Sequence, residues 1–190
     1  MLRSEQIRWS MPDSLCSVPD EGGKWGASDP VTEAAITGAA LVRHLEDFRF
    51  ASLRALRQLH RALGADRVAI GLIAADGHSI HEELAWAGGF GRCGESERVI
   101  SCEAFAAEMS AWLATRSCML EVEIDALAPV WHELSCDHLM LVRGGRVVEG
   151  RGQVALVVQM RNPARLADGA DHAMALLLDE YGRRRQAVSA

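Results

Sequence analysis

The last third of the chain, from His138 to Arg185, constrains the fold more than any other segment. Two apolar runs, HLMLVR and QVALVVQM, flank the glycine-rich link GGRVVEGRG. A polar link and the segment DGADHAMALLLDEY, which has the pattern of a capped amphipathic helix, follow them. Both faces of the second run are apolar, which is typical of a central strand covered on both sides. This order predicts a mixed α+β domain that ends in a helix.

The first 35 residues form a polar run punctuated by proline and glycine, which predicts a flexible or loosely docked tail. One domain is then expected over residues 36–190. Leucines and a phenylalanine recur at spacings of three and four from Leu41 to Leu63, so we expect one long helix from Thr32 to Leu63. Gly64 is expected to end this helix because glycine adopts the left-handed conformation readily.

Alternating or continuous apolar runs predict strands over residues 67–74, 80–86, 118–124, 138–143 and 153–160. Asp76-Gly77 predicts a hairpin turn, and Ile80, Leu84 and Trp86 are expected to share one face of the second strand. A loop is expected from Gly88 to Glu97. Helices are expected over residues 103–115, from Asp125 to Leu134, and from Asp168 or Asp171 to the C-terminus.

Charge and hydropathy exclude several classes of function. A net charge of −6 argues against a broad nucleic-acid surface, which needs clustered lysine and arginine. No apolar run reaches the length of about 18 residues that a membrane helix needs, and the N-terminus lacks the apolar core of a secretion signal. We therefore expect a cytoplasmic protein without membrane partners, in which the five cysteines remain thiols.

The order of the expected elements resembles a GAF domain over roughly residues 40–185. The resemblance rests on LRALRQLHRALGADRVAIGLIAADG at the front and on LMLVRGGRVVEGRGQVALVVQM with the closing helix at the back. It implies a central antiparallel sheet with strand order 2-1-5-4-3, helices on one face and a ligand pocket on the other. A PAS-like sensor shares much of this strand arrangement and is the alternative.

In GAF domains, loops and short helices between the second and fourth strands roof the pocket, which here corresponds to Gly88–Cys136. Aromatic side chains in this region would stack on a flat ligand, and an arginine and a histidine would hold a polar group. The same aromatic residues would otherwise serve as core packing. The expected ligand-binding residues are Trp86, Phe90, Arg92, Phe105, Trp112, Trp131 and His132.

Cys93 lies in a glycine-flanked loop beside Arg92, whose charge would favour the thiolate. One class of GAF-fold enzymes, the free methionine-(R)-sulfoxide reductases, uses cysteines around the pocket, and similarity to it assigns catalysis to Cys93, Cys102 and Cys136. The chain departs from that family in two places. ERVIS replaces the glycine-rich approach to Cys102, and the serine-rich segment after Cys136-Asp137 is absent.

His132 and Cys136 are one helical turn apart, but a metal site needs at least three convergent ligands, so the sequence predicts none here. No distinctive haem motif and no Cys-His pair of the bilin type occurs, which leaves the cofactor unknown. The expected function is a small-molecule sensor that acts on a regulatory protein partner or through a homodimer formed by its terminal helices. The alternatives are a thiol-dependent reductase and a ligand-free structural adaptor.

Overall fold

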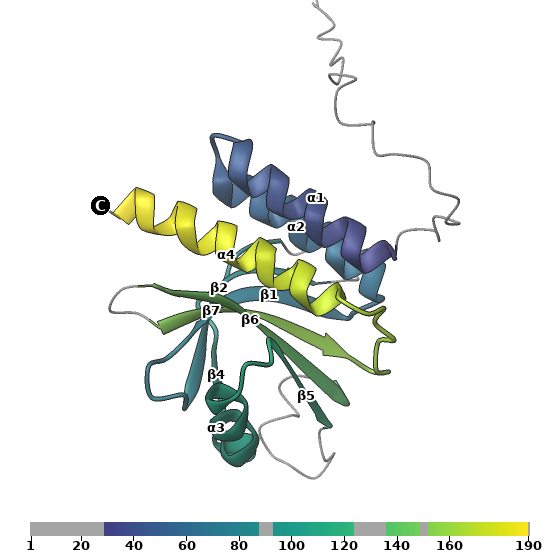
Figure 1. The fold of residues 1–190 in the computed structure, drawn as a ribbon, viewed down its shortest axis with the longest axis vertical. Coiled ribbons are helices and arrows are strands. Elements are labelled where there is room, and N and C mark those ends of the chain that lie inside the picture. Colours follow the sequence, from purple (N-terminus) through teal and green to yellow (C-terminus); the bar gives the residue numbers. More distant parts are fainter. Residues whose placement is uncertain (1–28, 88–92, 124–135, 149–151, 190) are drawn as a thin grey trace, which may run out of the picture.

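The structure is a computed structural model that describes residues 29–87, 93–123, 136–148 and 152–189. Figure 1 shows an antiparallel sheet with helices α1, α2 and α4 on one side and α3 on the other. The mixed α+β architecture expected from the sequence is therefore confirmed. None of the described helices combines the length and the apolar character that a membrane span requires.

Two helices replace the single long helix expected over residues 32–63, so that prediction was wrong. α1 (Pro30–His44) ends where Leu45 takes an extended backbone, and α2 (Phe48–Leu63) begins after Asp47. The Asp47 carboxylate accepts a hydrogen bond from Phe50 N at 2.9 Å. Such a cap satisfies an amide that every helix start leaves free, so it starts a new helix inside a continuous leucine stripe.

The folded part begins before residue 36, where the domain was expected to start. Asp29 caps α1 by accepting a hydrogen bond from Thr32 N at 2.9 Å, and both Val31 and Ala35 are buried. Residues 30–35 therefore belong to the domain rather than to a tail. Residues 1–28 lie outside the described residues.

The strand order confirms the order expected from the GAF resemblance. In the sheet the strands follow the order β3-β2-β1-β7-β6-β5, with β4 also paired to β2, and every neighbouring pair is antiparallel. Numbered by the five expected strands, β2-β1-β7-β6-β5 is the order 2-1-5-4-3. The strands span β1 (Arg67–Ile73), β2 (Ser79–Ala87), β3 (Cys93–Glu95), β4 (Val99–Ser101), β5 (Met119–Glu123), β6 (His138–Val148) and β7 (Gly152–Met160).

Other elements largely follow the sequence pattern. Gly77 takes a φ of 73° in the expected β1–β2 turn. A 3-10 turn (Glu103–Phe105) leads into α3 (Ala106–Ala114), and α4 (Ala170–Ser189) closes the fold. β3 and β4 were missed: β3 lies in the segment expected as a loop, β4 lies just after it, and both pair with β2. The helix expected over residues 125–134 lies outside the described residues.

Two apolar cores lie on opposite faces of the sheet. The face covered by α1, α2 and α4 is called the helix face, and the opposite face, covered by α3, is called the α3 face. Successive residues of a strand point to opposite faces, so the central strand β7 supplies side chains to both cores. On β7 the helix face has Val154, Leu156 and Val158, and the α3 face has Ala155 and Val157.

A β-bulge changes which residues of β2 point to each face. The register between β1 and β2 shifts between Ile70 and Gly71, whose partners are Leu84 and Glu82, so Glu83 is the extra residue. Ile80 consequently packs on the α3 face, whereas Leu84 and Trp86 pack on the helix face. The expectation that Ile80 shares a face with Leu84 and Trp86 was wrong for this reason.

Candidate functional site

The α3 face contains two of the expected ligand-binding aromatic residues. Phe105 comes from the 3-10 turn before α3 and Trp112 from α3 itself, and both are buried together with Met109. They belong to the same apolar core as Ile80 and Leu141 of the sheet. The structure thus brings Phe105 and Trp112 together over the sheet, where the resemblance placed a ligand pocket.

Trp86 lies on the opposite face and is not part of this arrangement. Its side chain packs against the core under the helices, and the Arg57 guanidinium carbon lies 5.4 Å from the centre of its ring. Because the β2 bulge turns Trp86 toward α2, the expectation that it lines the pocket with Phe105 and Trp112 was wrong. The expected contacts Phe90, Arg92, Trp131 and His132 lie outside the described residues.

Three cysteines, Cys102, Cys118 and Cys136, have the character of protonated thiols, while the side chain of Cys93 lies outside what the structure describes. Burial is the main cause that raises the pKa of each to about 11, at Cys102, Cys118 and Cys136. A hydrogen bond to the Asp171 carboxylate contributes further at Cys118. A thiol needs a lowered pKa to act as a nucleophile near neutral pH, so Cys102 and Cys136 are poorly suited to the catalytic role expected from the reductase resemblance.

Sequence reasoning missed a set of buried polar side chains on the α3 face. Arg67 forms an ion pair with Glu82, whose side chain is fully buried. The Ser96 hydroxyl donates a hydrogen bond to Glu82 Oε2 at 2.9 Å. By alternation from their neighbours in the two cores, Arg67 and Glu82 both point to the α3 face. The sequence signal for this set was a charged residue at an inward-facing position of each strand, but the pattern around Glu82 predicts a solvent-exposed hairpin.

Gln159 of β7 extends this polar set across the sheet. It is paired with Arg67 in the β1–β7 register, follows Val158 of the helix face, and is only 2% exposed. Within the described part of the chain, the buried Nε2 of Gln159 has no hydrogen-bond partner. Leaving such a donor unpaired costs free energy, so Gln159 is a candidate donor to a ligand on this face.

Trp112 presents a second buried donor. Its side chain is 4% exposed, and its indole N–H has no hydrogen-bond partner among the described residues. The guanidinium carbon of Arg143 lies 5.0 Å from the centre of the ring. Arg143 itself donates hydrogen bonds to the carbonyl oxygens of Leu113, Thr115 and Ser117. These contacts fix the indole ring by its face and leave its N–H available.

A polar connection joins β2 to α4 on the helix face. Glu83, the bulge residue, forms an ion pair with Arg185 and accepts a hydrogen bond from the Tyr181 hydroxyl at 2.9 Å. Burial, together with the negative charge of Glu83, raises the pKa of Tyr181. Tyr181 also packs against Phe48 of α2, with ring centres 5.6 Å apart. The bulge of one strand is thus tied to the last turns of the C-terminal helix.

Comparison with solved structures agrees with this architecture. The fold is similar to that of the phycocyanobilin-bound GAF domain from a cyanobacterial phytochrome, with a TM-score of 0.58 at 11% identity over 82% of this chain and 94% of that chain. It is also similar to the chromophore-binding domain of a bacteriophytochrome from R. palustris, with a TM-score of 0.58 at 13% identity over 90% of this chain and 64% of that one. The fold is GAF-like. The sequence matches no protein-family model and no curated protein.

Proposed function

We propose that the protein is a small-molecule-sensing regulatory module that binds its ligand on the α3 face and transmits occupancy to α4. The observation that carries the proposal is the double role of β2. Ile80 and Glu82 of this strand contribute to the α3 face, while the adjacent Glu83 holds Arg185 and Tyr181 of α4. A displacement of β2 by a ligand would therefore act directly on the C-terminal helix.

The proposed site combines apolar and polar contacts. Phe105 and Trp112 would bound a flat ligand, and the unpaired donors of Trp112 and Gln159 would bind its acceptor oxygens. Phe90, Arg92, Trp131 and His132 remain proposed contacts from the roof of the pocket. The solved neighbours are described as binding phycocyanobilin or biliverdin, which supports a planar, acceptor-bearing ligand for this fold.

We propose that the output is a change in the packing of α4 against α1, read by a regulatory protein or by a second copy of the chain. α1 and α4 lie side by side in the helix layer (Figure 1). Apolar side chains on these helices are exposed, at Ile36, Leu176 and Val188, and would offer contacts to a partner. Cys102, Cys118 and Cys136 are free thiols, which fits action in the reducing cytoplasm.

Native mass spectrometry of the protein purified from its own host tests the binding step. We expect a retained small molecule whose occupancy falls in Trp112→Phe, which removes only the indole donor, and is unchanged in the control Trp86→Phe on the helix face. Titration with biliverdin, monitored by the visible absorbance of the pigment, tests whether the protein binds the class of ligand found in the structural neighbours. If the protein purified from its host carries no bound molecule, the result would contradict a sensor function and favour a ligand-free structural adaptor.

Hydrogen exchange with and without the retained molecule tests the transmission step. We expect release of the molecule to speed amide exchange over residues 180–188, and Glu83→Gln to abolish this difference without lowering occupancy. Solution scattering on the same samples reports whether a dimer forms and whether it rearranges. Identical exchange in both states would show that binding on the α3 face does not reach α4.

The adaptor has one observation in its favour. Phe105, Met109 and Trp112 are all buried, so the described part of the α3 face is filled by the protein's own side chains. Filling of this kind stabilises the fold without a ligand. Buried polar atoms without a partner among the described residues also occur in the helix layer, at Gln58, His60 and Arg184, so the donors of Trp112 and Gln159 support a ligand only together with their place on the α3 face.

A further inference from the structure

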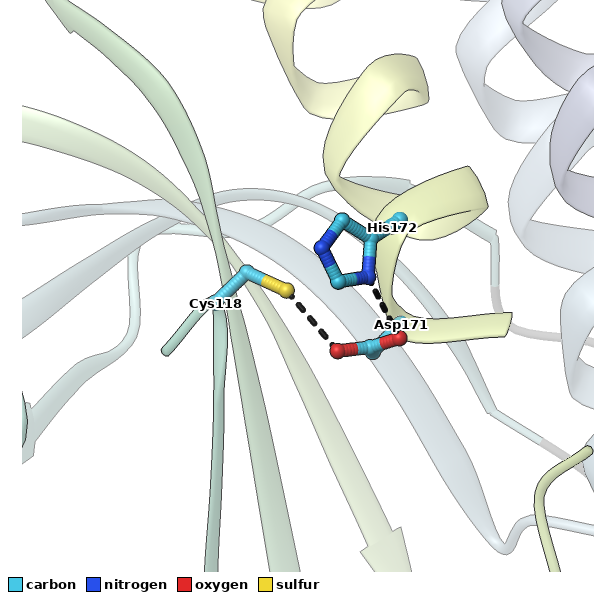
Figure 2. Close-up of side chains that lie close together, drawn as sticks. All are labelled: Cys118, Asp171 and His172. Atoms are coloured by element: carbon cyan, nitrogen blue, oxygen red, sulfur yellow. Dashed lines mark hydrogen bonds and ion pairs between the residues drawn. The ribbon is translucent and has the colours of Figure 1, made fainter. Parts of the chain in front are cut away.

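Three side chains of different chemistry meet where β5 and α4 begin. Cys118 directly precedes β5, and Asp171 and His172 lie in the first turn of α4 (Figure 2). The Cys118 thiol donates a hydrogen bond to Asp171 Oδ2 at 3.0 Å, and His172 Nδ1 lies 2.9 Å from Asp171 Oδ1. One donor atom from each residue can be chosen so that all lie within 4.8 Å of one another.

This combination matches the ligand chemistry of zinc. Cysteine sulfur, histidine nitrogen and aspartate oxygen are its usual protein ligands, with bond lengths of about 2.0–2.3 Å. Ligand atoms around one tetrahedral ion are consequently about 3–4 Å apart, close to the separations found here. A thiolate and a carboxylate together also neutralise the charge of a divalent ion.

The fourth coordination position would face an open groove. The His172 side chain is 81% exposed and lines a groove of about 490 Å³ together with Cys118. Arg116 and Arg143 line the same groove, and Asp179 lines it further along α4. The two arginines and the positive end of the α4 dipole disfavour a bare cation there and favour an anion as the fourth ligand. Three protein ligands and one exchangeable position are typical of zinc sites that bind small molecules.

We propose that Cys118, Asp171 and His172 bind one Zn²⁺ ion, with an exchangeable anion from the groove as the fourth ligand. The Cys118 thiol releases its proton to solvent as its sulfur binds the metal. The site is formed by α4 and the chain before β5, away from Phe105 and Gln159 on the α3 face. It therefore goes beyond the proposed ligand-binding function, and it would join an edge of the sheet to the start of α4.

Titration of the metal-free full chain with Co²⁺ tests the proposal. We expect one ion per chain, with the visible absorption of tetrahedral cobalt and a near-ultraviolet charge-transfer band from thiolate to cobalt. Zn²⁺ should displace Co²⁺ and raise the melting temperature. Cys118→Ser should remove the charge-transfer band and weaken Co²⁺ binding by at least about tenfold, because a side chain bound directly to the metal is lost.

His172→Gln and His78→Gln form a matched pair, since both histidines are exposed and we expect neither replacement to disturb the metal-free fold. His172→Gln should weaken Co²⁺ binding while His78→Gln does not. A charge-transfer band that persists in Cys118→Ser would assign metal binding to another cysteine and overturn the proposal. Equal Co²⁺ affinity in wild type and His172→Gln, or no binding at all, would also overturn it. These outcomes do not depend on whether the α3 face binds a ligand.

Discussion

The two faces of the sheet differ in what they bury. The helix face packs aliphatic side chains of three helices against the sheet, and the polar residues that it buries, Ser52 and Glu180, are bonded to Phe48 O and to Arg43 and Arg183. The α3 face has a smaller described core and buries Glu82 and Gln159 within it. Apolar packing stabilises a fold without selecting a ligand, whereas buried polar groups cost stability and provide specificity. The helix face is therefore the stabilising face and the α3 face the candidate recognition face.

The largest expected effect tests the helix face. Leu177 of α4 is fully buried there, so Leu177→Ala should lower the free energy of unfolding by about 4 kcal/mol through lost burial and a residual cavity. The neighbouring Leu176 is 46% exposed, and Leu176→Ala should change stability by less than about 0.5 kcal/mol. Urea unfolding measures both. Equal losses would show that α4 does not pack as described.

The α3 face is tested by breaking its buried ion pair. Glu82→Gln keeps the shape of the side chain but leaves Arg67, whose side chain is 17% exposed, without a counter-charge. We expect a loss of about 3 kcal/mol in urea unfolding. Glu95→Gln is the control, because the Arg49–Glu95 pair is exposed and should contribute less than about 1 kcal/mol. A Glu82→Gln variant as stable as the wild type would mean that water reaches the Arg67–Glu82 pair and that this face is not closed.

Breaking the connection between β2 and α4 should lower stability less than breaking the Arg67–Glu82 ion pair does. Glu83→Gln replaces a charge-assisted contact to Arg185 by a neutral one and keeps an acceptor for the Tyr181 hydroxyl. We expect a loss of about 1–2 kcal/mol in global stability. Amide exchange should rise first in residues 180–188, at the end of α4. Exchange that rises evenly over the whole sheet would argue against a local connection.

A pH titration examines the margin of the helix face. Hydrogen bonds from Arg43, and then from Arg183, hold the pKa of Glu180 below its ordinary value of 4.5. A lowered folded-state pKa means that this contribution is complete above pH 4.5 and is lost as the pH falls through the folded value. The stability difference between wild type and Glu180→Gln should therefore shrink on acidification below pH 4.5. A difference that does not vary with pH would exclude an ionic contribution.

The smallest effect is expected at Trp112. Because its indole N–H has no partner among the described residues, Trp112→Phe should change the stability of the ligand-free protein by only about 1 kcal/mol, mainly through lost packing. A much larger loss would indicate that the N–H is hydrogen-bonded in the free protein. Such a result would mean that Trp112 is a residue of the structural core and not a ligand contact.

Much of the architecture could be predicted because the sheet is strongly patterned. β1, β5, β6 and β7 each show a clear apolar alternation or run, and α4 has an amphipathic pattern. β3 and β4 span three residues each, which is too short for a period of two to be visible. The break between α1 and α2 was missed because the leucine stripe continues across the Asp47 cap, where a local hydrogen bond decides the outcome.

The candidate site was less predictable because its members depend on register. Phe105 and Trp112 were found from their position after the second strand, but Trp86 was placed on the wrong face. Glu82 was missed because its partner, Arg67, comes from another strand, and single-sequence alternation carries no information about a bulge. The residues of the proposed metal site are also invisible as a motif, since Cys118 and Asp171 are 53 positions apart.

The β2 bulge has a consequence for how this chain can vary over evolutionary time. With Glu83 inserted, the residues before it and the residues after it follow opposite phases of the strand. Deleting Glu83 would remove the bulge and leave the residues on both sides of it on the faces they now occupy, but it would also remove the contacts to Arg185 and Tyr181. A related protein that is one residue shorter in this strand should accordingly keep both cores and lose the connection to α4.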